Sequence, residues 1–151
     1  VAWSPDNTFV ASCGYDGTLQ IWDPVSGSRK AIYSGDGNFL FGLSWSPDGT
    51  QIAVGTTDGN VHVLDANSAQ VIYSYPGNSS EVNDVSWSRD GTRIAFGTDS
   101  GTVQIFDAST RRGIYTYYGQ TGHIDAVAWS PNSQLIASGS DQSIVQIWQA
   151  R

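Results

Sequence analysis

Positive charge is scarce in this sequence. Lysine and arginine together number 7 of 151 residues against 14 aspartates and glutamates, giving a formal net charge of −7. Binding to a nucleic-acid backbone requires clustered lysine and arginine, so nucleic acid is excluded as the expected partner. No apolar run is long enough to span a membrane and no signal-peptide pattern opens the chain, so we expect a cytoplasmic protein with no membrane contact.

Sulfur is scarce as well. Cys13 is the single cysteine, so no disulfide can form within the chain, and a small buried thiol is its expected role. Methionine is absent, and the chain starts at Val1 in the middle of a sequence pattern. We therefore expect a piece of a longer gene product.

Glycine and tryptophan are abundant, with 17 and 6 residues, and this combination of turn formers and aromatics favours an all-β fold. The sequence also repeats itself, because shifting it by 42 residues aligns four units without a gap. The units begin near residues 1, 43, 85 and 127. Each carries a tryptophan at the same place: Trp3, Trp45, Trp87 and Trp129.

Each unit predicts three short strands joined by tight turns, at residues 1–4, 9–13 and 18–22 in the first unit. A fourth stretch rich in Ile, Tyr and Thr follows at 31–35, 71–77 and 113–119, which suits a pleated strand. Four strands with short connections form an antiparallel meander. Only three such fourth stretches are present, so we expect the last blade to lack its outer strand.

The second and third strands of each unit are apolar on both faces, as in the run Leu19, Ile21 and Trp22. A sheet with one face in water would alternate strictly, so these sheets are expected to be covered on both sides. One position holds only a small residue, which permits close approach of sheets: Ala11, Ala53, Ala95 and Ala137. Stacking around a common axis meets these requirements and predicts a β-propeller of about four blades.

The strand ends "IWD" at 21–23, "VLD" at 63–65, "IFD" at 105–107 and "IWQ" at 147–149, with the turn "WSPDG" at 45–49, resemble the WD40 repeat family over the whole chain. The stretches "AVAWSP" and "VQIW" are similar to the regular WD40 arrays of bacteria. The resemblance implies four-stranded antiparallel blades and the following structural residues: Trp3, Ser12, Asp16, Trp22, Trp45, Asp58, Trp87, Trp129, Ser138 and Trp148.

That family also has a Gly-His pair near the start of each unit, whose histidine joins a hydrogen-bond chain to Ser/Thr, Asp and Trp. Here the corresponding pairs are Gly35-Asp36, Gly77-Asn78 and Gly119-Gln120, so another polar residue replaces each histidine. We therefore expect these blades to depend more on apolar packing than on a buried polar network.

The resemblance further implies that partners bind at the loops before the first strand and between the second and third strands. These loops give Tyr15, Phe39, Phe41, Thr57, Glu81, Asn83, Asp99, His123, Asp125 and Asp141, with Asp84 as a further candidate acid. Aromatic anchors within an acidic rim fit a basic or arginine-containing peptide. The alternative is that Phe39 and Phe41 fold back onto the blade and the acids are solvated turn residues.

Motifs for catalysis or for cofactors are weak. His62 lies between two valines on a third strand, where a structural role is expected, and His123 has no His or Cys at ligand spacing. A triad of Ser130, His123 and Asp125 has no nucleophile elbow to support it. We expect no cofactor and no bound metal.

The sequence thus predicts a non-enzymatic scaffold for protein–protein interaction. One alternative is a sensor or regulatory propeller fused to a signalling domain outside these residues, and a remote one is an enzyme with its site in the propeller channel. Four blades do not complete a WD40 ring. The expected additional partners are therefore the remaining blades of the same chain, or a second copy that completes an eight-bladed ring.

Overall fold

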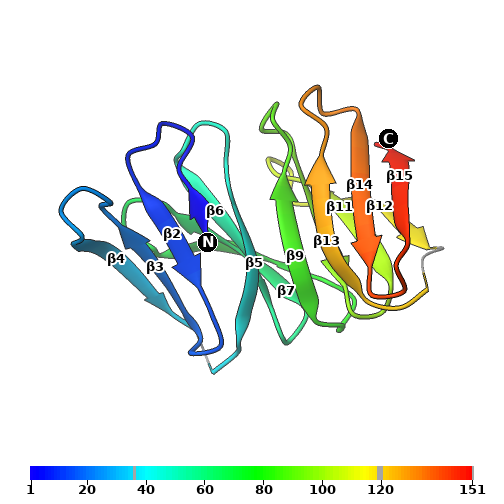
Figure 1. Ribbon diagram of the computed structural model, residues 1–151, viewed down its shortest axis with the longest axis horizontal. Coiled ribbons are helices and arrows are strands. Elements are labelled where there is room, and N and C mark those ends of the chain that lie inside the picture. Colours follow the sequence, from blue (N-terminus) through cyan, green and yellow to red (C-terminus); the bar gives the residue numbers. More distant parts are fainter. Residues whose placement is uncertain (36, 119–120, 151) are drawn as a thin grey trace.

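A computed structural model describes residues 1–35, 37–118 and 121–150, and these form strands and turns without a helix. The strands make four separate sheets, numbered I to IV here, arranged side by side in chain order (Figure 1). Sheet I comprises β1 (Ala2–Trp3), β2 (Val10–Cys13), β3 (Thr18–Trp22) and β4 (Arg29–Ser34). Sheet II comprises β5 (Leu40–Trp45), β6 (Gln51–Thr56), β7 (Asn60–Asp65) and β8 (Val71–Pro76).

Sheet III comprises β9 (Val82–Trp87), β10 (Arg93–Thr98), β11 (Thr102–Asp107) and β12 (Gly113–Tyr118). Sheet IV comprises β13 (Ile124–Trp129), β14 (Leu135–Ser140) and β15 (Val145–Gln149). Each sheet is an antiparallel meander in which neighbouring strands pair in chain order. The predicted all-β fold of propeller blades is confirmed.

Neighbouring sheets are joined through their first strands, which lie next to one another in the order β1, β5, β9 and β13. The indole N–H of Trp45 donates to the carbonyl oxygen of Ala2 at 3.2 Å, and that of Trp129 donates to the carbonyl oxygen of Ser86 at 3.0 Å. Both bonds connect residues 43 positions apart. The indole bond therefore fastens sheet II to sheet I and sheet IV to sheet III. The indole N–H of Trp87 instead donates to the Gly91 carbonyl oxygen in its own sheet, and the Trp87 backbone N–H donates to Ser44 Oγ of sheet II.

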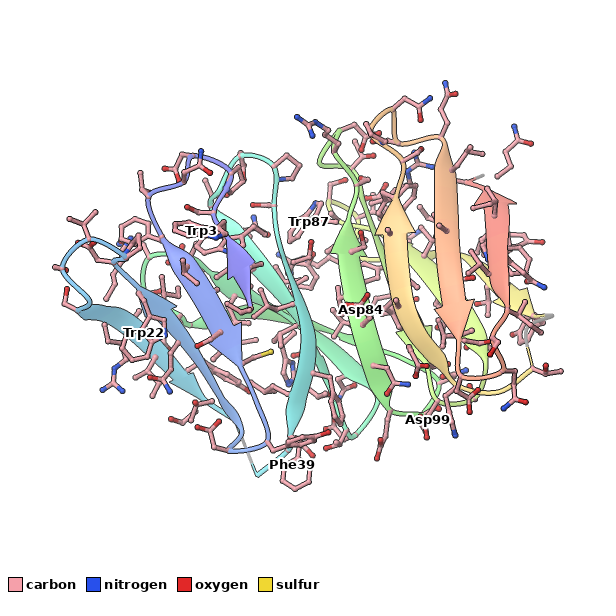
Figure 2. The ribbon with its side chains drawn as sticks, in the orientation of Figure 1. Trp3, Trp22, Phe39, Asp84, Trp87 and Asp99 are labelled. Carbon is pink, nitrogen blue, oxygen red and sulfur yellow. The ribbon has the colours of Figure 1, made fainter. Side chains whose placement is uncertain are left out.

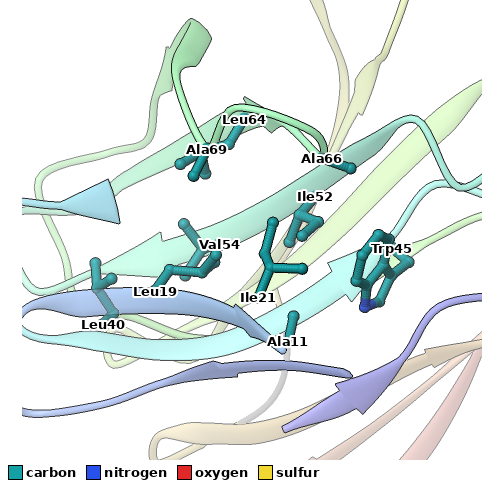
Figure 3. Packing of buried hydrophobic residues seen from close by; sticks show 10 residues of the cluster. All are labelled: Ala11, Leu19, Ile21, Leu40, Trp45, Ile52, Val54, Leu64, Ala66 and Ala69. Atoms are coloured by element: carbon teal, nitrogen blue, oxygen red, sulfur yellow. The ribbon is translucent and has the colours of Figure 1, made fainter. Parts of the chain in front are cut away.

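The core is divided into clusters of apolar side chains at the junctions between sheets. At the junction of sheets I and II, Ile21 of β3 packs with Ile52 and Val54 of β6, and all three are fully buried (Figure 3). The residue between them, Ala53, belongs to the next cluster, which lies between sheets II and III. Strand β6 thus buries both faces, as its apolar composition predicts.

Close approach of sheets II, III and IV requires glycine at one repeated position of sheets II and III. A Cβ on Gly55 would lie 2.5 Å from Cγ1 of Val82, and one on Gly97 would lie 2.4 Å from Cγ2 of Ile124. Sheet I has Cys13 at this position, and its thiol donates a hydrogen bond to the carbonyl oxygen of Phe41 on the neighbouring sheet. Burial raises the pKa of the Cys13 thiol to about 11, so this group is a poor nucleophile.

The polar pair expected inside each blade forms in two sheets. The indole N–H of Trp22 donates to Ser12 Oγ at 3.1 Å, and that of Trp148 donates to Ser138 Oγ at 2.7 Å. In sheet III the same two positions hold Phe96 and Phe106. Both rings pack with the ring of Tyr75, which lies on strand β8 of sheet II. Apolar packing therefore replaces the polar pair where the sequence lacks it.

The other expected members of the polar chain have different partners. Asp16 is exposed and accepts hydrogen bonds from Thr18 in its own turn. Asp58 accepts a hydrogen bond from Thr56 and another, at 3.1 Å, from Nδ2 of Asn38. Of the positions that replace the family's histidine, Asp36 and the pair Gly119-Gln120 lie outside the described residues.

The outward faces of sheets I and IV are open, and the sheets do not close into a ring within the described residues. Trp3 is 58% exposed, whereas Trp45 and Trp87 at the equivalent position are each 8% exposed. On sheet IV, Val145 and Ile147 are 73% and 63% exposed, although their equivalents in the other sheets are buried. Trp3, expected to be a structural residue, is therefore more exposed than its equivalents Trp45 and Trp87.

Candidate partner-binding surface

The residues expected to form a partner surface come from turns at one end of the sheets. Figure 2 shows Phe39 and Asp99 at that end, whereas Trp3 and Trp87 lie nearer the opposite end. The turn between the second and third strands of each sheet supplies Tyr15, Thr57, Asp99 and Asp141. Phe39, Glu81 and His123 directly precede the first strands, and the second residues of those strands supply the other three: Phe41, Asn83 and Asp125.

Bulges in the first strands bring three of these residues into irregular backbone. The pairing register shifts between Leu40 and Leu43 in β5 and between Ile124 and Ala126 in β13. The pairing of β9 with β10 shifts in the same way, between Gly97 and Thr98 of β10. The residues displaced from regular pairing include Phe41, Asn83 and Asp125, which are equivalent positions in the repeat. A bulge redirects side chains, and such positions are common at the ends of sheets that bind ligands.

Three aromatic rings, Tyr15, Phe39 and Phe41, form what we call the aromatic group. The Tyr15 ring lies 5.5 Å from each phenylalanine ring, centroid to centroid, at interplanar angles of 87° and 89°. These are favourable edge-to-face contacts. Tyr15 remains 71% exposed and Phe39 48% exposed, whereas Phe41 is half-buried. Phe41 is therefore the less exposed of the two phenylalanines.

Polar side chains gather where sheets III and IV meet. His123 Nδ1 lies 2.9 Å from Asp99 Oδ1 and 2.8 Å from the Asp99 carbonyl oxygen. Asn83 donates to Asp99 Oδ1 at 3.1 Å, and the His123 backbone N–H donates to Asp141 Oδ1 at 3.0 Å. The hydrogen bond to the Asp99 carbonyl, and then the Asp99 carboxylate charge, raise the pKa of His123 above its ordinary value.

Thr57 connects the turn of sheet II to the segment that carries Phe39. The Phe39 backbone N–H donates to Thr57 Oγ1 at 3.3 Å, and Thr57 Oγ1 also lies 3.4 Å from Asn38 Oδ1. Sequence reasoning did not include Asn38 in this surface, because its equivalents in the repeat are Ser80 and Gly122 and show no shared pattern. Its link to Asp58 fixes the backbone beneath the aromatic group.

Two of the expected acids are exposed and chemically available. Within residues 1–35, 37–118 and 121–150, neither the Glu81 nor the Asp125 carboxylate accepts a side-chain hydrogen bond or joins an ion pair. Asp125 is close enough to His123 to contribute to its raised pKa. These carboxylates keep their full capacity to accept bonds from a cation or donor on another molecule.

Asp84 is different from the other acids, because it lies mid-strand on β9 between two neighbouring sheets (Figure 2). Its Oδ2 accepts a hydrogen bond of 2.8 Å from the Val127 backbone N–H of sheet IV. On the other side it lies against Gly42 of sheet II, whose Cβ, if present, would be 2.4 Å from Asp84 Oδ1. Burial raises the pKa of the Asp84 carboxyl. Asp84 is therefore a junction residue and not part of the acidic surface.

The geometry gives no support to the triad of Ser130, His123 and Asp125. Ser130 follows β13 and His123 precedes it, so a six-residue strand of roughly 20 Å separates them. Ser130 Oγ instead donates to Asn132. Among the described residues, no group of three or more His, Cys, Asp or Glu side chains is placed to hold a metal ion.

His62 belongs to the packing between sheets I and II. Its Nδ1 lies 2.7 Å from Ser74 Oγ on the adjacent strand β8. Its ring meets the Tyr33 ring of sheet I at 6.1 Å in an edge-to-face arrangement. These contacts are those of a structural histidine.

Residues 1–151 match the family model described as the WDR19 first beta-propeller. No curated protein matches the chain. In the part of the chain that the structure describes, no helix is long and apolar enough to cross a membrane.

Proposed function

Since the chain belongs to the WDR19 first beta-propeller family, we propose that it is a non-enzymatic scaffold that binds protein partners through the aromatic group and the neighbouring acids. Membership of a propeller family supports protein binding in general. The position of the binding surface and the basic character of the partner are proposals that come from the residues themselves. Propeller strands are structural, and the connecting turns are free for recognition.

One observation carries the proposal, namely that exposed aromatic rings and unpaired carboxylates share one end of the sheets. Tyr15 and Phe39 offer ring faces to an arginine or lysine side chain, an interaction worth about 0.5–1 kcal/mol at an exposed site. Glu81 and Asp125 can pair with further cations of the same segment.

A short fluorescent peptide that alternates arginine with glycine provides a direct test, with its citrulline twin as the uncharged control. Fluorescence polarisation is expected to show weaker binding, by roughly fivefold, to Tyr15→Ala and to Asp125→Asn. Tyr115→Ala is the matched control, because this tyrosine is 44% exposed but lies on the outer strand β12. Equal binding of the arginine and citrulline peptides would refute a basic partner. Equal binding to all three variants would refute this surface.

We also propose that the open faces of sheets I and IV are covered in the working protein by further blades of the same chain or by a second copy. The support is that Val145 and Ile147 are exposed at positions that are buried in every other sheet. Sedimentation velocity on the 151-residue chain distinguishes the two, because a second copy gives a defined dimer, whereas faces that need further blades give association of no fixed size. A stable, folded monomer with no tendency to associate would contradict the need for any cover.

A cytoplasmic location is part of the same proposal. The half-buried thiol of Cys13 has no cysteine partner anywhere in the sequence, which suits a reducing compartment. Fractionation of cells that make the protein checks this. Recovery from the secreted or membrane fraction would overturn it.

A further inference from the structure

A broad hollow lies at the end opposite the aromatic group. It has a volume of about 440 Å³, within the range of ligand pockets in proteins. The turns between the first and second strands of all four sheets converge on it, each through the same position of the repeat. Its lining includes Pro5, Pro47, Arg89 and Pro131, with Trp87 and Trp129.

Two smaller hollows at the same end are formed by equivalent positions of the repeat. One is lined by Ser4 and Asp6, and the other by Ser46 and Asp48, which are the same positions 42 residues later. They recur because neighbouring sheets stack in the same way each time. The 440 Å³ hollow differs from these two, because it takes one turn from every sheet.

Arg89 is the departure from the repeat within this hollow. The other three sheets have proline there, a residue that presets the turn conformation. Arg89 is exposed, and within residues 1–35, 37–118 and 121–150 its guanidinium has no hydrogen-bond, ion-pair or ring partner. Nothing in the packing therefore explains the exchange of proline for arginine.

Arg93, the next arginine along the chain, is by contrast committed to the structure. Its guanidinium donates to the Ser133 carbonyl oxygen at 2.7 Å and lies 3.6 Å from Asp90 Oδ2. It also lies 4.7 Å from the ring centroid of Trp129. Arg93 thus satisfies the nearest carboxylate and holds the Trp129 ring in place. Arg89 is left as the free cation of the hollow.

We propose that this hollow binds an extended, acidic segment of a partner protein, with a proline or leucine side chain against the exposed proline rings and the half-buried Trp129, and a carboxylate on Arg89. Indole and proline rings present flat apolar faces, and a guanidinium pairs with carboxylate through two parallel N–H donors. The net charge of −7 opposes an acidic ligand only weakly, because salt screens charges beyond about 8 Å under physiological conditions.

The proposed occupant is tested with the peptide Ac-Leu-Pro-Glu-Leu-amide and its glutamine twin. Binding is followed through the indole N–H signals of Trp87 and Trp129 in NMR spectra, with Trp22, in sheet I away from the hollow, as an internal reference. The glutamate peptide is expected to shift the two signals and to bind about tenfold more tightly than the glutamine peptide. Equal affinities, or shifts of the reference signal alone, would overturn the proposal.

The variant Arg89→Pro is the sharpest probe, because three other sheets already carry proline at this position and the fold is expected to survive. It should bind the glutamate and glutamine peptides equally. Arg112→Gln removes the same charge from an exposed turn outside the hollow and should leave the preference for glutamate unchanged. An equal loss in both variants would mean that net charge alone is responsible.

Phe39→Ala, at the opposite end, should leave the binding of both peptides unchanged, which separates this site from the proposed basic-peptide surface.

Discussion

Phe106 lies at the centre of sheet III, where truncation to alanine tests the idea that aromatic packing replaces the polar pair of the other blades. The side chain is 0% exposed, and its ring is stacked on Tyr75 with a centroid distance of 4.1 Å and an interplanar angle of 4°. A second ring, Phe96, lies 6.2 Å away in an edge-to-face arrangement. Phe106→Ala removes both contacts and leaves a cavity between sheets II and III.

The expected loss is about 3–5 kcal/mol of unfolding free energy, the usual cost of a fully buried phenylalanine. The stack with Tyr75 should account for about 0.5–1.5 kcal/mol of it, measured as the coupling in a double-mutant cycle with Tyr75→Ala. Phe106→Leu should cost only about 1–1.5 kcal/mol, because leucine fills most of the volume. Sheet II has leucine at this position, as the fully buried Leu64.

Urea unfolding followed by tryptophan fluorescence measures these differences. Phe39→Ala is the matched control, since it makes the same chemical change at a side chain that is 48% exposed, and it should cost about 1 kcal/mol. Similar losses for Phe106→Ala and Phe39→Ala would refute the reasoning. A coupling of zero with Tyr75 would show that the stack contributes nothing beyond its buried area.

Two further predictions concern titratable groups. Asp99→Asn should lower the pKa of His123 toward 6.5, which NMR titration measures. Because pairing with Asp99 raises this pKa, the stability that the pair adds is complete below pH 6.5. That stability is lost as the pH rises through the pKa of His123 in the folded protein. An unchanged His123 titration would rule out the pairing. Asp84→Asn should raise the urea midpoint of unfolding at pH 7, since burial disfavours the ionised carboxylate. Asp84→Ala leaves the Val127 N–H without its acceptor and should lower the free energy of unfolding by about 1–3 kcal/mol. Equal midpoints for the two variants would argue against this hydrogen bond.

The sequence predicted the strands well because each unit repeats the same spacing of apolar residues and turns. The third strand of the first unit, predicted at 18–22, is β3 (Thr18–Trp22). The first strand, predicted at 1–4, is shorter, at Ala2–Trp3. Such boundaries depend on pairing geometry, which composition does not specify.

The surface was less predictable than the fold. The repeat placed Tyr15 and Phe39 in turns at one end, but their ring contact depends on the distance between two sheets. Asp84 was grouped with the exposed acids because it follows Asn83, although alternation along a strand sends adjacent side chains to opposite faces. Its equivalents, Gly42 and Ala126, are small, and that pattern was the available sign of a crowded junction. Arg89 had a similar sign, a single exception to proline.

The bonds that connect residues 43 positions apart have a consequence for how such a molecule changes over generations. Trp45 reaches back to Ala2 and Trp129 reaches back to Ser86 through the indole N–H. The backbone N–H groups of Trp87 and Trp129 each donate to the serine hydroxyl 43 positions earlier, so the junctions reuse related contacts with a fixed direction. A gene segment encoding 42 residues, if duplicated in frame, would enter the series with suitable neighbours on both sides. Copying can therefore lengthen the series of sheets without redesigning any junction, while single exchanges such as that at residue 89 give one copy a chemistry of its own.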